Sequence, residues 1–233
     1  MSLTIRRSAE RGYADHGWLK ARHSFSFAEY YDPQHMGFRS LRVINQDIVA
    51  PGYGFPTHGH RDMEIFTYVL EGVIEHRDSM GNHAQLRPGQ IQVMSAGSGV
   101  KHSEFNPSAS DRLHLLQVWL QPNRLGLKPR YAEWTPTPEK LKEPKVLIIS
   151  QDGREGSATI SQDASVYRVM APAGSTFEHQ LAAGRGLWLQ LIKGELIVGD
   201  QTLNPGDAVS TEKAGKWQFK AGQEVEALLF DLG

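Results

Sequence analysis

The sequence predicts an all-β protein built from two consecutive, similar β-barrels. Short apolar runs alternate with Gly, Pro, Asn and Asp residues, which is the pattern of strands separated by turns. Sustained helical periodicity is nearly absent, and only two stretches could hold a turn or short helix, at 138–142 and 25–31. The clearest apolar runs are 41–45, 64–70, 90–95 and 113–120.

An internal repeat predicts that the chain consists of two similar halves. Three segments of the first half recur in the same order in the second, at offsets between 113 and 122 residues. A collinear repeat of this length indicates a duplicated domain rather than a propeller blade or a solenoid turn. The matched pairs are 67–78 with 189–200, 86–102 with 203–217, and 113–120 with 226–233.

The segment between the two halves is rich in proline, with five prolines at 121–144. Proline removes the backbone donor that a central strand needs, so this segment is expected to be a linker ordered against the barrels. We therefore predict an N-terminal barrel at 1–122, a linker at 123–144 and a C-terminal barrel at 145–233. At 233 residues, two domains of this size can each bury an adequate core.

Composition narrows the classes of function. The 25 basic and 26 acidic residues nearly cancel, and no run of like charge suggests binding to nucleic acid or to a membrane surface. The chain has no cysteine, so any metal must be bound by His, Asp or Glu, and a reducing compartment is expected. Without an apolar stretch resembling a signal peptide or a membrane span, the sequence predicts a cytoplasmic protein.

Two pairs of metal-ligating residue types occur at strand spacing. His58 and His60 are two residues apart, and so are His102 and Glu104. Residues at i and i+2 of a strand leave from the same face, so both pairs can point into one barrel interior. Three imidazoles and one carboxylate, with no thiolate, suit iron, nickel, zinc, copper, manganese or cobalt, and composition alone does not choose among them.

The same residues lie in two degenerate motifs that resemble those of the cupin superfamily. Gly52 followed by His58-x-His60 and a closing Gly72 is similar to the first cupin motif, and Gly89 with Gly97 and His102 is similar to the second. The usual glutamate position of the first motif falls on Ile65, while Glu64 lies one residue early and would face the other side of the strand. A ligand displaced to Glu104 is the pattern of the pirin family, which the segments 23–33, 36–47, 58–72, 77–82 and 94–107 also resemble.

The pirin resemblance implies a bicupin, with two consecutive antiparallel β-barrels of the jelly-roll, double-stranded β-helix type. It also implies that the N-terminal barrel binds one divalent metal, with Fe(II) expected first, through His58, His60, His102 and Glu104. The second half has only His179 where His58-Gly59-His60 would match, so we expect no metal there and a hydrogen-bonded or surface role for His179. Asp62 and Glu64 are kept outside the metal site.

The resemblance also implies an activity. Bacterial pirins of this kind are quercetinases, which open the central ring of a flavonol with O2 and release carbon monoxide. In that reaction Glu104 would be both a ligand and the group that takes the proton of the flavonol hydroxyl. The alternative reading is a metal-dependent, redox-sensitive regulatory protein that acts through contacts with a protein partner.

Overall fold

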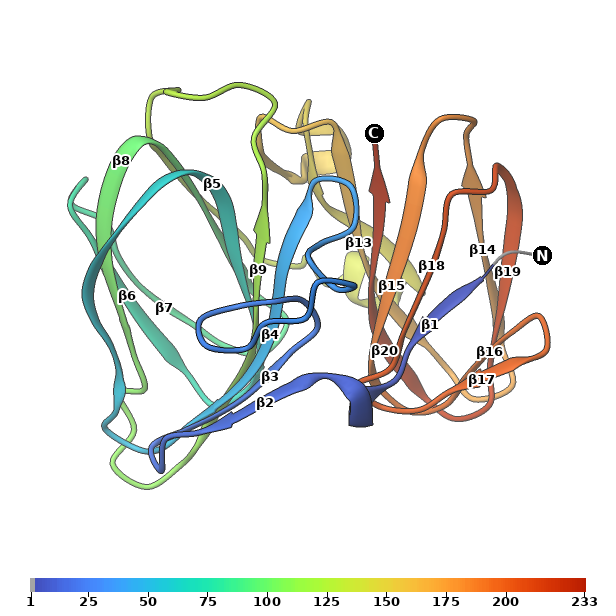
Figure 1. The fold of residues 1–233 in the computed structure, drawn as a ribbon, viewed down its shortest axis with the longest axis horizontal. Coiled ribbons are helices and arrows are strands. Elements are labelled where there is room, and N and C mark those ends of the chain that lie inside the picture. The colour runs from blue at the N-terminus through green and yellow to red at the C-terminus, as the bar shows by residue number, and fades with distance from the viewer. Residues whose placement is uncertain (1–2) are drawn as a thin grey trace. The chain divides into compact units, whose positions relative to one another are not determined.

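The computed structural model describes residues 3–233, and this part of the chain is almost entirely β-structure (Figure 1). Its helical segments are three short 3-10 turns, one of which, Lys140–Lys142, falls in a stretch where the sequence allowed a turn. The other such stretch contains a tight turn closed by the bridge between Phe27 and Tyr30. The all-β prediction is therefore confirmed.

The described chain forms two compact units, of which the N-terminal unit comprises Gly12–Thr135 together with Ala158–Gln162. Its main sheet is antiparallel in the order β2-β3-β4-β9-β5-β8-β6-β7, and β10 pairs with β8. Figure 1 shows the two longest strands, β5 and β8, curving beside each other. The strands are β2 (Gly12–Asp15), β3 (Leu19–His23), β4 (Leu41–Val49), β5 (Gly54–Glu71), β6 (Ile74–Asp78), β7 (His83–Leu86), β8 (Ile91–Phe105), β9 (Leu113–Leu120) and β10 (Arg130–Trp134).

Alternating apolar residues give the N-terminal unit its core. In β9, Leu113 and Leu115 are each 1% exposed, and Val69 and Ile74 pack in the same core. Burying one such side chain stabilises the fold by about 1.5–3 kcal/mol. This packing fixes β5, β6 and β9 relative to one another.

The C-terminal unit comprises the remaining residues, Pro136–Ser157 and Asp163–Gly233, with the N-terminal segment through Arg11. One sheet has the strand order β1-β18-β15-β20-β13-β11, and a second has the order β14-β19-β16-β17. Their apolar faces share one core. The strands are β1 (Thr4–Arg6), β11 (Lys145–Ser150), β13 (Ala164–Ala171), β14 (Thr176–Leu181), β15 (Gly186–Lys193), β16 (Leu196–Val198), β17 (Gln201–Leu203), β18 (Ala208–Thr211), β19 (Gly215–Ala221) and β20 (Val225–Leu232).

Two short segments belong to a different unit from the one that their position in the sequence suggests. Strand β1 pairs with β18, with Ile5 opposite Val209. Conversely, 158–162 belongs to the N-terminal unit, where the carboxylate of Glu64 accepts a hydrogen bond of 2.8 Å from the backbone N–H of Ser161. Boundaries drawn at 122 and 144 do not describe these two segments.

The first part of the proline-rich segment, through Thr135, is ordered within the N-terminal unit. Its residues Arg130–Trp134 form β10, and Trp134 is only 5% exposed. The carbonyl oxygen of Leu127 accepts a hydrogen bond of 2.7 Å from Ser98 N–H and lies against Gly97. Gly97 has a positive φ of 47°, and a Cβ there would overlap this carbonyl, so the close approach of the linker requires glycine.

No helix within residues 3–233 combines the length and the apolar character that a membrane span requires.

Candidate metal centre

Two neighbouring strands bring three predicted ligands together. His58 and His60 lie on β5, His102 lies on β8, and His58 is directly opposite His102 in the antiparallel register. The pairing of β5 with β8 is irregular between Phe55 and His58 and again just after His60. Such irregularities bend and twist a strand locally and can re-aim its side chains.

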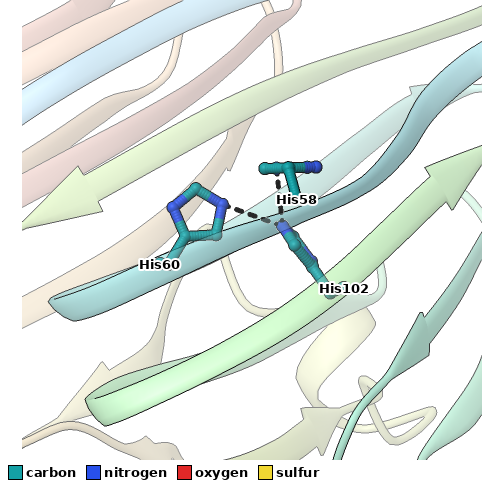
Figure 2. A group of neighbouring side chains, drawn as sticks. All are labelled: His58, His60 and His102. Atoms are coloured by element: carbon teal, nitrogen blue, oxygen red, sulfur yellow. Dashed lines mark hydrogen bonds between the residues drawn. The ribbon is translucent and has the colours of Figure 1, made fainter.

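The three imidazole rings point their Nε2 atoms at one another (Figure 2). The Nε2 atom of His102 lies 3.0 Å from that of His60 and 3.1 Å from that of His58. Two imidazole nitrogens bound at about 2.1 Å to one metal, at a right angle to each other, would also lie about 3.0 Å apart. The spacing therefore fits three nitrogens of one metal site.

The protonation of these rings also suits a metal. The backbone carbonyl of Pro56 can only accept, so Nδ1 of His58, 2.8 Å away, carries the proton and leaves Nε2 with a free lone pair. Burial and then the neighbouring imidazoles lower the pKa of His60 to about 4 and the pKa of His102 to about 3. Both rings are thus neutral at pH 7, as a ligand must be.

The three histidines differ in exposure, and this leaves the centre accessible. His58 is exposed, His60 is half-buried and His102 is only 2% exposed. His58 and His60 line a cavity of about 90 Å³ together with Trp119, Phe27 and other residues. A site with three protein nitrogens and an open side can admit an external ligand, as catalytic metal sites do.

A larger cavity of about 630 Å³ adjoins the first, because Leu19, Ala21, His23 and Phe27 line both. Aromatic rings run along this path. The ring of Trp119 contacts those of His60 and Phe27 edge to face, at centroid distances of 4.9 and 5.5 Å.

Glu104, the fourth predicted ligand, is buried at the inner side of the centre. Gln92 and Gln117 donate side-chain amide hydrogen bonds of 3.0 and 2.7 Å to its two carboxylate oxygens, and the Thr67 hydroxyl lies 3.0 Å from one of them. Glu104 lines the same small cavity as His58 and His60.

Among the described residues, two groups of ligand atoms lie within 4.8 Å of one another, and both are in the N-terminal unit. One is His58, His60 and His102, and the other is His76, His102 and Glu104. The structure therefore joins Glu104 to the centre through His102, and does not place it in one group with all three predicted histidines.

His76 and Asp78 are the residues that the sequence reasoning missed. Both side chains on β6 are fully buried, and Nδ1 of His76 lies 3.4 Å from Nδ1 of His102. The signal was present: in Ile74-Glu75-His76-Arg77-Asp78, period-2 alternation puts His76 and Asp78 on the face of the buried Ile74.

Glu64 lies outside the centre, as expected from its position one residue early. Its carboxylate accepts hydrogen bonds from Ser95, at 2.5 Å, and from Ser161. In the C-terminal unit, His179 is 5% exposed and its Nε2 atom lies 2.7 Å from the Asp231 carboxylate. Glu64 and His179 thus have hydrogen-bonded partners of their own.

Two β-sheet units in one chain, with inward histidines on adjacent antiparallel strands of the first, define a protein of the two-domain cupin class. The comparisons with known proteins agree. The model of the pirin family matches residues 4–120, and the model of the quercetinase C-terminal cupin domain matches residues 147–232. The chain belongs to the pirin family, which confirms the resemblance seen in its motifs.

Several relatives match the whole chain. It is 45% identical to quercetin 2,3-dioxygenase of Escherichia coli K12, covering 99% of this chain and 98% of that protein. It is 37% identical to a pirin-like protein of Caulobacter vibrioides, over 94% and 95% of the two chains. The crystal structure of the bacterial pirin YhhW from E. coli in complex with nickel(II) is 44% identical, covers 99% of both chains and gives a TM-score of 0.95.

Proposed function

We propose that the chain is a metal-dependent quercetin 2,3-dioxygenase, which opens the central ring of a flavonol with O2 and releases carbon monoxide. The observation that carries the proposal is the convergence of the His58, His60 and His102 Nε2 atoms beside a cavity with aromatic walls. The full-length similarity to an E. coli protein named quercetin 2,3-dioxygenase supports the same activity.

The proposed centre holds one divalent transition metal through these three histidines, with Glu104 as the fourth ligand. The donor set contains imidazole and carboxylate but no thiolate, which suits Fe(II), Ni(II) and the other borderline divalent ions. Fe(II) remains the metal expected from the family, and the nickel(II) complex of the E. coli relative supports a divalent ion in general.

The metal, the Glu104 carboxylate and two glutamine amides have different roles in the proposed reaction. When bound, the metal supplies a Lewis acid that lowers the pKa of a flavonol hydroxyl coordinated to it. The Glu104 carboxylate takes up the proton of that hydroxyl, because it is an acceptor that lines the same cavity as His58 and His60. The amides of Gln92 and Gln117 hold each carboxylate oxygen in a fixed direction.

The shape and polarity of the cavities favour a flat aromatic substrate. The inner cavity, at about 90 Å³, is too small for a drug-sized ligand, whereas the adjoining cavity of about 630 Å³ falls in the usual range. Edge-to-face contacts join Trp119 to His60 and to Phe27, and the rings of His23 and Tyr30 stack at 6.2 Å further out. We place the reacting end of the flavonol beside Trp119 and the remainder in the outer cavity.

Three further points belong to the same proposal. Each unit is a double-stranded β-helix barrel of the bicupin type, which the antiparallel pairing and the cupin-domain match at 147–232 support. The barrels correspond to 1–122 and 145–233, except that the segment through Arg11 belongs to the C-terminal unit and 158–162 belongs to the N-terminal unit. The protein acts in the cytoplasm, a proposal that the lack of cysteine in the sequence supports.

The test is the loss of quercetin absorbance by metal-reconstituted protein, with and without O2. We expect O2-dependent loss together with release of carbon monoxide, and no loss with His102→Ala. A metal-loaded protein that leaves quercetin unchanged in air would reject the dioxygenase and favour the regulatory alternative.

A further inference from the structure

The buried residues of β6 contact the candidate centre from behind, yet none of them belongs to the proposed ligand set. Strand β6 pairs with β8, so that Asp78 is opposite His102 and His76 is opposite Glu104. Both side chains are fully buried. Buried polar groups cost free energy unless they are hydrogen-bonded, so their hydrogen bonds show what they do.

The amide of Gln92 fixes the protonation of His76. Its nitrogen lies 3.0 Å from a carboxylate oxygen of Glu104, and a carboxylate accepts only, so this atom is the NH2 group. The same nitrogen lies 2.9 Å from Nδ1 of His76, which therefore accepts and carries no proton. The proton of the neutral His76 ring is then on Nε2, 3.3 Å from an oxygen of Asp78 to which it donates.

The bare Nδ1 atom of His76 in turn acts on the tautomer of His102. Nδ1 of His102 lies 3.4 Å from it, so a proton on that atom points at a group that can accept it. The contact therefore stabilises the tautomer of His102 that carries its proton on Nδ1. This leaves Nε2 of His102 with its lone pair, directed at the Nε2 atoms of His58 and His60.

Asp78 is held so that it can act only as an acceptor toward His76. One of its oxygens accepts from the backbone N–H groups of Met80, at 2.9 Å, and Asn82, at 3.1 Å. The other accepts from the Asn82 side-chain amide, at 2.8 Å, and from His76. Because the two backbone donors cannot reverse, the turn at 78–82 fixes the direction of the whole chain of hydrogen bonds.

We propose that Asp78 and His76 are positioning residues that hold His102 in the tautomer with a free Nε2 lone pair and so raise the affinity of the centre for its metal. The inference rests on the proposed metal site at His58, His60 and His102, but not on the proposed reaction. Outer partners that orient a ligating histidine typically contribute 10- to 100-fold to metal affinity or activity.

The primary test is the Asp78→Asn variant. The two backbone donors of the turn select the amide oxygen, so the new NH2 group faces His76 and requires Nε2 of His76 to accept. The His76 proton then moves to Nδ1, opposite the N–H groups of Gln92 and His102, and His102 is driven toward the tautomer with its proton on Nε2. A His76→Phe variant removes the acceptor itself while keeping a ring that can stack on Tyr131.

Two readouts are measured on the full chain. Competition of Ni2+ binding against a chromophoric chelator should show dissociation constants about 10- to 100-fold weaker in Asp78→Asn and His76→Phe than in the wild type. Two-bond 1H–15N spectra of the metal-free proteins should show a larger fraction of His102 with its proton on Nδ1 in the wild type than in Asp78→Asn. Asn82→Ala is the matched control, because it removes one donor to Asp78 in the same turn and leaves His76 in contact.

The outcomes separate the alternatives. Wild-type affinity in both variants, or an unchanged His102 tautomer in Asp78→Asn, would overturn the proposal. An equal loss in Asn82→Ala would also overturn it, since the effect would then come from the turn and not from His76. Failure of the wild type to bind Ni2+ would reject the metal site, while the spectra of the metal-free protein would still test the tautomer.

Discussion

Glu104→Gln tests the second role proposed for Glu104, that of proton acceptor. The substitution keeps the shape of the side chain and removes its negative charge. Two side-chain amides donate to this carboxylate, from Gln92 and from Gln117. Because hydrogen bonds to a charged group contribute about 1.5–3 kcal/mol and neutral ones about 0.5–1.5 kcal/mol, each loses roughly 1 kcal/mol.

The network around Glu104 can absorb much of this change. If the Gln117 side-chain amide flips, its oxygen can accept a hydrogen bond from the new NH2 group at position 104. The Thr67 hydroxyl, which lies 3.1 Å from the Gln117 oxygen in the wild type, can then donate to the remaining oxygen at position 104. Removal of a buried charge also recovers some desolvation energy. We therefore expect the free energy of unfolding to fall by at most about 2 kcal/mol, which lowers Tm by about 4–8 °C.

Activity should change far more than stability. We expect Glu104→Gln to retain most of its metal through the three histidines, while quercetin turnover falls by about 10²- to 10⁴-fold, the usual contribution of a positioned base. The assay follows quercetin absorbance in air at equal metal content, with Thr67→Val as a control that keeps the carboxylate and should turn over nearly normally. Wild-type turnover by metal-loaded Glu104→Gln would refute the role of Glu104 as proton acceptor.

Three further predictions concern the fold around the centre. In the folded chain, burial lowers the pKa of His60 from the ordinary 6.5 to about 4 and that of His102 to about 3. At pH values below about 6.5 and above these lowered pKa values, the unfolded chain therefore binds more protons than the folded chain. The metal-free protein should therefore lose stability as the pH falls from about 6.5 to 4 and gain none from this source above 6.5, as urea unfolding at a series of pH values would show. Glu64→Ala removes the acceptor of the buried Ser95 hydroxyl and should lower the free energy of unfolding by about 1–3 kcal/mol, also measured in urea. Gly97→Ala should lower Tm because its methyl group would overlap the Leu127 carbonyl at a positive φ, which differential scanning calorimetry measures.

Matched variants distinguish these effects from general damage. Glu71 forms an exposed ion pair with Arg112, so Glu71→Ala should change stability by less than about 1 kcal/mol. Gly81 has a positive φ of 93° but open space around its Cβ position, so Gly81→Ala reports the backbone strain alone. A loss in Glu64→Ala no larger than in Glu71→Ala, equal losses in Gly97→Ala and Gly81→Ala, or a pH-independent stability of the metal-free protein, would contradict the respective arguments.

Strand geometry related the predicted ligands only in pairs. The i, i+2 spacing puts His58 and His60 on one face of a strand and does the same for His102 and Glu104, while the resemblance to the cupin motifs related the two pairs to each other. Which residue lies opposite which was not predictable, because the register of β5 with β8 shifts twice along their length. Only the structure shows that His58 is opposite His102.

The residues that support the centre from behind were harder to find. His76 contacts Gln92 and His102 of β8, and no local pattern shows that β6 pairs with that strand. The exchange of segments has a similar cause: Ile5 pairs with Val209 through contacts about 200 residues apart, which no local pattern encodes. Long-range pairing of this kind is settled by packing of the whole unit rather than by local sequence.

The most direct test of the account is the metal content of His102→Ala after reconstitution with a divalent metal and removal of unbound ions. The account predicts one metal ion per chain in the wild type and none in His102→Ala, with both proteins folded, while His179→Ala in the C-terminal unit should keep one. A folded His102→Ala protein that retains a full equivalent of metal would show that the ion binds elsewhere, and would contradict the centre proposed at His58, His60 and His102.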